Sequence, residues 1–226
     1  MTRHLLLGLG ATVALAACSP SAPTAAPAAT AAAPAQPGIR LLPDVTDLGF
    51  AALPAGTLLR QLHVADDDGE GLMLLSRQED AFTDEDGVDQ DRITLTATLY
   101  QRDDAQSAWE LAWQNVDPTE CPGLDLQAGF FLEPFQATDL DGDGRAEYTV
   151  ASHAFCGGGV DPHALQILLV QGDDALVVEG ESVVQVEGDP PFGGDRQDSP
   201  EVAEAPAAIR QHLDQVWARI KQGPAA

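Results

Sequence analysis

An alternating run over residues 92–102 is the feature that most constrains how this chain can fold. Its centre reads Ile-Thr-Leu-Thr-Ala-Thr-Leu-Tyr, with an apolar residue at every second position and threonines between. Side chains of a β-strand alternate between the two faces of a sheet, whereas a helical pattern repeats every 3.6 residues. The run therefore predicts a strand whose buried face is formed by Ile93, Leu95, Ala97 and Leu99.

Shorter runs on both sides have the same character. After a polar turn at 101–106, residues 109–113 alternate again, which predicts a hairpin with Trp109, Leu111 and Trp113 facing the core. Further strands are expected at residues 57–64, 71–77, 129–134, 147–153, 164–171, 176–179 and 182–186. The expected fold is mainly β, with antiparallel sheet or sheets made of two meander-like units.

The C-terminus changes to a helical period. Pro206 suits a first helical turn, and Gly223-Pro224 suits a helix end. One helical face is formed by Ile209, Leu213, Val216, Trp217 and Ile220. We expect one amphipathic helix at about 204–222, packed on the sheet, and a single β-rich domain over residues 39–222.

The acidic composition limits the partners. The formal net charge is −25, from 36 acidic and 11 basic residues. Such a charge repels nucleic acid and anionic lipid, so nucleic acid is excluded as an electrostatic partner. It is compatible with divalent cations, with cationic ligands or with plain solubility.

Residues 139–147 read Asp-Leu-Asp-Gly-Asp-Gly-Arg-Ala-Glu. Carboxylates at loop positions 1, 3, 5 and 9 suit a hard cation, and calcium takes 6 to 8 oxygen ligands. The glycines permit backbone turns that other residues resist. We therefore expect a structural Ca²⁺ site; its ligands would be Asp139, Asp141, Asp143, the carbonyl oxygen of Arg145, and Glu147. The alternative is an Asp/Gly turn that only connects two strands.

The loop is not an EF-hand. An EF-hand needs a bidentate Glu at position 12, which is Val150 here, and the residues that follow predict a strand. The loop instead resembles the strand-flanked calcium loops of integrin-type β-propeller repeats, Asp-x-Asp-x-Asp-Gly-x-x-Asp, with Glu147 in place of the last Asp.

A wider resemblance covers roughly residues 115–185. Cys121-Pro122, the acidic loop with Thr138 before it, Cys156, Val160, Pro162 and the apolar run 165–169 resemble bacterial proteins named for surface polysaccharide biosynthesis. That resemblance implies a β-rich fold with one acidic loop. Gly157-Gly158-Gly159 departs from the polar pattern that the family has after its second cysteine.

The N-terminus predicts export. Residues 1–17 have a basic start, a short apolar run and small residues at the end, which is typical of a signal peptide. Leu-Ala-Ala-Cys at 15–18 resembles the lipobox of bacterial lipoproteins, which implies cleavage before Cys18 and acylation of that residue. The Ala/Pro-rich residues 18–38 predict a disordered linker. The expected location is the cell envelope, with the lipid anchor in the membrane, by resemblance the outer one, and the domain in the periplasm or at the surface.

Export to an oxidising compartment predicts a disulfide between the two remaining cysteines, Cys121 and Cys156. A zinc site drawing together these cysteines with His153 and His163 is the alternative. The acidic runs 66–70 and 84–91 are interpreted as solvated loops.

No nucleophile with its base stands out in the sequence. The chain has no Gly-x-Ser-x-Gly motif, and paired carboxylates are uninformative among 36 acids. The favoured hypothesis is a non-catalytic, calcium-stabilised binding or assembly module, with an envelope protein or polysaccharide as its partner. An enzyme or accessory factor acting on surface polysaccharide is the second hypothesis, and a low-affinity cation buffer is the third.

Overall fold

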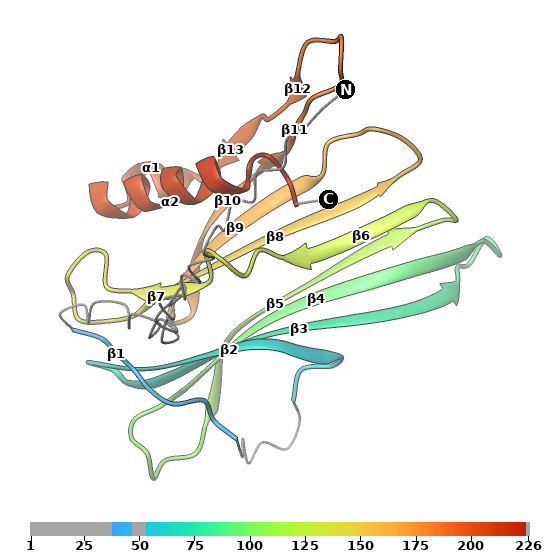
Figure 1. The fold of residues 1–226 in the computed structure, drawn as a ribbon. Coiled ribbons are helices and arrows are strands. Elements are labelled where there is room, and N and C mark those ends of the chain that lie inside the picture. The colour runs from blue at the N-terminus through green and yellow to red at the C-terminus, as the bar shows by residue number, and fades with distance from the viewer. Residues whose placement is uncertain (1–37, 47–52, 225–226) are drawn as a thin grey trace, which may run out of the picture. The chain divides into compact units, whose positions relative to one another are not determined.

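The computed structural model describes residues 38–46 and 53–224. Within these residues the fold is mainly β and antiparallel, as the sequence predicts, with helices at the C-terminal end (Figure 1). In this part of the chain, no helix is both long and apolar enough to span a bilayer. Cys18, the predicted signal peptide and most of the predicted linker lie outside the described residues.

The first sheet is a meander in which strands adjacent in sequence are adjacent in space. It contains β1 (Arg40–Leu41), β2 (Thr57–Asp66), β3 (Gly69–Thr83), β4 (Asp89–Arg102) and β5 (Glu110–Cys121). The alternating run lies in β4, and its predicted apolar face is buried: Ile93, Leu95, Ala97 and Leu99 are each at most 5% exposed. This confirms the strand interpretation.

The second sheet has the order β13-β10-β9-β8-β6, and β7 also pairs with β8. Its strands are β6 (Asp125–Phe130), β7 (Gln136–Thr138), β8 (Glu147–Gly157), β9 (Ala164–Gln171), β10 (Asp174–Glu181) and β13 (Arg196–Asp198). A small ribbon pairs β11 (Val183–Val184) with β12 (Phe192–Gly193). The strand expected at residues 129–134 corresponds to β6. This strand ends at Phe130, so residues 131–134 are not part of it.

The two sheets pack face to face around one core. Val64, Met73 and Leu99 of the first sheet belong to the same buried cluster as Val150 and Val170 of the second. The other face of the second sheet packs on the helices, where Ile167 and Leu169 meet Leu213. The second sheet is therefore the middle of three layers, which explains why β9 is apolar on both faces.

The C-terminal segment forms two helices rather than the single helix expected at 204–222. They are α1 (Pro200–Glu204) and α2 (Ala207–Ile220). Pro206 causes the break, because a residue before proline is disfavoured in the helical conformation, and Ala205 is extended at φ −63° and ψ 154°. The apolar face of α2 is buried against the second sheet, as predicted.

The predicted direction of Leu111 is wrong. Leu99 pairs with Trp113 and the next residue, Tyr100, pairs with Leu111, so Ala112 is an extra residue in β5. Such a bulge reverses which face the following side chains occupy. Leu111 is 58% exposed, while Trp113 packs against the core between the sheets.

Candidate metal centre

The acidic loop connects β7 to β8 at one end of the second sheet. Three of its aspartates fold it by accepting hydrogen bonds from backbone N–H groups within the loop. The bonds run from Gly142 to Asp139, from Asp143 to Asp141 and from Arg145 to Asp143, at 2.9, 3.1 and 2.8 Å. Gly142 and Gly144 have φ of +78° and +85°, a region that favours glycine.

This fold gathers four carboxylates. Asp139, Asp141, Asp143 and Glu147 each place one oxygen so that all four oxygens lie within 4.8 Å of one another. Over residues 38–46 and 53–224, this is the one group of three or more acidic, His or Cys side chains close enough to hold a metal ion. These are the four carboxylates that the sequence predicts as ligands. The prediction that the Arg145 carbonyl oxygen is a further ligand stays a prediction.

Glu147 differs from the three aspartates because its side chain is buried. It is only 2% exposed, and its Oε2 accepts a 2.8 Å hydrogen bond from the backbone N–H of Leu140. Burial, together with the charges of the three aspartates, raises the pKa of Glu147 to about 7, although the hydrogen bond from Leu140 acts in the opposite direction. A cation bound among the four carboxylates would favour the charged form of this buried side chain.

A pocket of about 440 Å³ borders the site. Asp141 and Glu147 line it from the loop, Asp174 from β10, and Glu201 and Glu204 from α1. The surroundings are thus negative on more than one side, which favours the entry of cations.

The β2–β3 turn supports the loop from the first sheet, which the sequence does not indicate. The Asp66 carboxylate accepts a 2.9 Å hydrogen bond from the N–H of Ala146, and the N–H of Asp67 donates to the carbonyl oxygen of Gly144 at 3.0 Å. The guanidinium of Arg145 pairs with Asp68 at 2.5 Å. The interpretation of residues 66–70 as a solvated loop is therefore wrong.

Gly38 also lies against the loop, at the start of the described domain. Its φ is +100°, and a Cβ there would lie 2.4 Å from Oδ2 of Asp139 and 3.0 Å from Cα of Gly144. A larger residue would collide with the loop, so three segments distant in sequence meet at the acidic loop.

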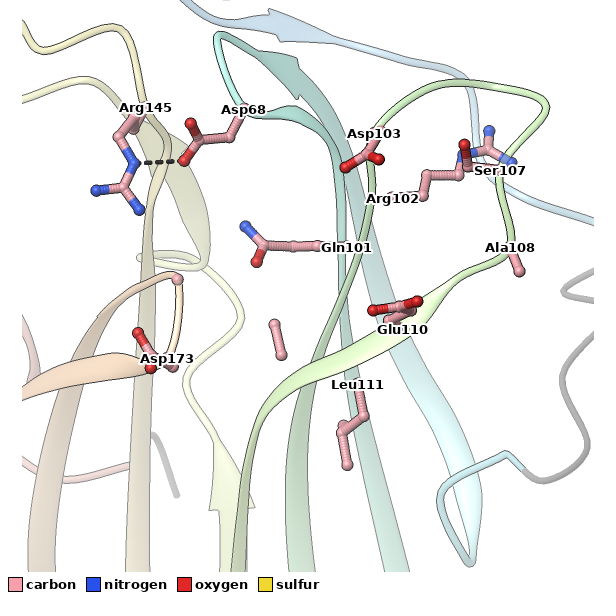
Figure 2. A pocket seen from close by; sticks show the side chains of 12 residues that line it. Asp68, Gln101, Arg102, Asp103, Ser107, Ala108, Glu110, Leu111, Arg145 and Asp173 are labelled. Carbon is pink, nitrogen blue, oxygen red and sulfur yellow. Dashed lines mark hydrogen bonds and ion pairs between the residues drawn. The ribbon is translucent and has the colours of Figure 1, made fainter.

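A second pocket, of about 600 Å³, lies beside this junction (Figure 2). It is lined by polar groups that include the Arg145–Asp68 pair, Asp103 and Glu110 of the β4–β5 hairpin, and Asp173 of the β9–β10 turn. A mixed lining of carboxylates and a guanidinium suits a ligand with many hydroxyl groups, because both kinds of group form hydrogen bonds with hydroxyls.

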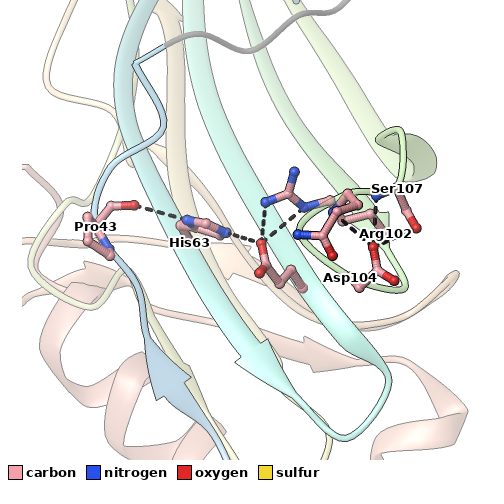
Figure 3. A network of polar contacts seen from close by, with 7 residues as sticks. Pro43, His63, Arg102, Asp104 and Ser107 are labelled. Carbon is pink, nitrogen blue, oxygen red and sulfur yellow. Dashed lines mark hydrogen bonds and ion pairs between the residues drawn. The ribbon is translucent and has the colours of Figure 1, made fainter.

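A polar network fixes the hairpin that borders this pocket (Figure 3). The Nε of Arg102 donates to Glu70 at 3.0 Å, and the Nε2 of His63 lies 2.9 Å from the same carboxylate oxygen. The Nδ1–H of His63 donates to the carbonyl oxygen of Pro43 at 2.9 Å. Burial opposes ionisation of Glu70, but the bonds from Arg102 and His63 outweigh it and lower its pKa.

The two cysteines lie at disulfide distance. Cys121, the last residue of β5, and Cys156 in β8 have their sulfur atoms 2.07 Å apart. The disulfide links the first sheet to the second. It also removes both sulfurs from the alternative zinc site, which leaves the two histidines of that group.

Residues 84–88 of the acidic run 84–91 form the β3–β4 turn, and residues 89–91 begin β4. One oxygen of Asp84 accepts hydrogen bonds from the N–H groups of Asp86 and Val88, at 3.0 and 2.9 Å. Asp84 thereby stabilises the turn. No residue of this run belongs to a group of side chains close enough to hold a metal ion.

Comparisons with known proteins give no relative: no family model, no curated protein and no solved structure matches this chain.

Proposed function

We propose that the acidic loop is a calcium site that stabilises a non-catalytic binding or assembly module. The observation that carries the proposal is the approach of four carboxylates to within 4.8 Å, one of them buried. Carboxylates this close repel one another unless a cation lies between them. Calcium suits an irregular set of oxygen ligands, whereas magnesium demands near-octahedral geometry and retains waters.

The role of calcium is to fix the junction between the sheets. The loop is held by the β2–β3 turn of the first sheet and continues directly into β8 of the second. An ion that binds the folded loop, but not the unfolded chain, stabilises the whole domain by mass action. Calcium would thereby make the junction between the two sheets rigid.

Calorimetric titration with calcium tests this proposal. We expect one strong site in the wild type and its loss in Asp141→Asn, which removes one ligand charge. Asp86→Asn is the matched control, because it removes the same charge from the β3–β4 turn. Equal binding by Asp141→Asn and wild type would refute the site, and several equivalent weak sites would favour a cation buffer.

We further propose that the chain is a lipoprotein of the cell envelope, anchored by acylated Cys18. The support is the residue pattern at 1–18 and the Ala/Pro-rich stretch that follows, which suits a tether. More than one acyl chain gives stable anchoring where a single chain does not. Labelled palmitate should enter the wild type and not Cys18→Ser, which should appear in the soluble fraction; a labelled or membrane-bound Cys18→Ser would contradict the anchor.

The polar pocket of about 600 Å³ favours a second candidate function, the binding of surface polysaccharide. Its carboxylates and the Arg145 guanidinium are the groups that would accept and donate hydrogen bonds to sugar hydroxyls. Purified envelope polysaccharide should then bind the wild type, and Glu110→Ala should weaken binding while calcium binding is unchanged. If the wild type and Glu110→Ala bind polysaccharide with equal affinity, this pocket is not the polysaccharide-binding site.

A further inference from the structure

Two histidines of the second sheet face each other away from the acidic loop. The Nδ1 of His153 in β8 and the Nδ1 of His163, just before β9, lie 3.3 Å apart. A neutral imidazole carries one N–H and one lone pair, so two facing Nδ1 atoms share a single proton between them. The same arrangement offers two nitrogen ligands once that proton moves to an outer nitrogen.

The separation fits a tetrahedral metal ion. With Zn–N bonds of about 2.05 Å, nitrogens 3.3 Å apart subtend about 107° at the ion, close to the tetrahedral angle. We infer that His153 and His163 form a binding site for a zinc-type transition-metal ion, with waters completing the coordination. Imidazole suits such ions and not calcium, which takes oxygen ligands, so this site is chemically separate from the acidic loop.

Neighbouring groups hold both rings in place. Phe155 stacks on the ring of His163 with centroids 4.7 Å apart, and Phe131 lies 5.3 Å from the ring of His153. The backbone of His163 exchanges two hydrogen bonds with Ser182: its N–H donates to the hydroxyl at 2.9 Å, and its carbonyl oxygen accepts at 2.8 Å. Such support reduces the cost of orienting the ligands when a metal binds.

Gly129 makes room for one imidazole. It lies opposite His153 in the pairing of β6 with β8, and a Cβ at this position would be only 3.0 Å from Nε2 of His153. Any larger residue would press on the ring, so the glycine is compatible with the observed orientation of this ligand.

Zinc titration of the full-length protein, with calcium saturating, tests the inference. We expect one zinc ion to bind the wild type, and affinity to fall by about tenfold or more in His153→Gln and in His163→Gln. His63→Gln is the matched control, because both ring nitrogens of His63 are engaged by Pro43 and Glu70. Circular dichroism identifies any variant that fails to fold. A calcium titration of each variant shows whether the acidic loop is intact, so the zinc test and the calcium test can fail independently.

Nuclear magnetic resonance of the wild type gives a readout that needs no variant. Zinc should shift the ring resonances of two of the five histidines, assigned to His153 and His163. Absence of zinc binding, shifts confined to other histidines, or unchanged zinc affinity in both folded variants would leave a hydrogen-bonded pair only and would overturn the inference.

Discussion

Glu147 combines two properties that rarely coincide in a structural carboxylate. It is buried, and three other carboxylates lie within a few ångströms of it. Burial disfavours the charged form of an acid, and like charges disfavour it further. At the scale of single residues, the calcium proposal therefore depends on Glu147 more than on any of the exposed aspartates.

Glu147→Gln should make the calcium-free protein more stable and the calcium response smaller. Glutamine keeps an oxygen that can accept the Leu140 N–H, but it carries no charge to bury. At pH 8 with chelator we expect a gain in unfolding free energy on the order of 2 kcal/mol, measured by denaturant titration. Asp141→Asn removes the same charge from an exposed position and should gain much less; equal gains would argue against burial as the cause.

His212 should make stability depend on pH. Its Nε2 lies 2.8 Å from the Oγ1 of Thr149 inside the helix–sheet interface. Burial, aided by Arg219, lowers its pKa below 6.5, so the unfolded chain binds a proton in a pH range where the folded chain does not. Stability contributed by neutral His212 is therefore complete above pH 6.5 and is lost as the pH falls below that value.

The difference in unfolding free energy between wild type and His212→Gln isolates this contribution, because all other titrating groups are shared. The difference should shrink as the pH falls from 7 to 5, in urea titrations at each pH. A difference that stays constant over this range would show that His212 does not titrate in this way.

At the scale of elements, the β2–β3 turn acts as a support for the acidic loop. Its contacts join residues 80 positions apart, Asp66 and Ala146, and it contributes none of the four clustered carboxylates. Groups that hold a ligand-bearing segment commonly affect metal affinity nearly as much as the ligands do.

Asp66→Ala should therefore weaken calcium binding by about tenfold or more, although Asp66 is not a ligand. Asp66→Asn keeps an oxygen that can accept the Ala146 N–H and should bind calcium more tightly than the alanine variant. Calorimetric titration of both variants decides the point. If the alanine variant binds calcium as the wild type does, the turn is a neighbour of the loop without a supporting role.

At the scale of the whole molecule, the sequence predicts elements better than contacts. Alternation identifies β4 and its buried face because period-2 patterns depend on one strand alone. The loop carboxylates converge as predicted, since residues 139–147 are local in sequence and their turns are set by the aspartates and glycines.

Features that depend on distant or single residues escape this reasoning. The bulge at Ala112 inserts one residue into β5 without a compositional signal, and it turns Leu111 outward. The stacking of two sheets and the meeting of the β2–β3 turn with the loop both follow from tertiary packing. Pro206 is a recognisable signal for the start of a helix. In the structure it precedes a second helix, α2, and does not lie inside one helix at 204–222.

Thermal unfolding of the full-length protein with the disulfide intact tests the central claim most directly. It should be recorded in chelator, across a calcium titration, and in magnesium as the control. At a calcium concentration 100 times Kd, mass action adds about 2.7 kcal/mol. For a domain of this size, that corresponds to a rise in Tm of roughly 5–10 °C, with little effect of magnesium. A Tm that is the same in chelator and in calcium would contradict the account and leave the acidic loop as a turn between two strands.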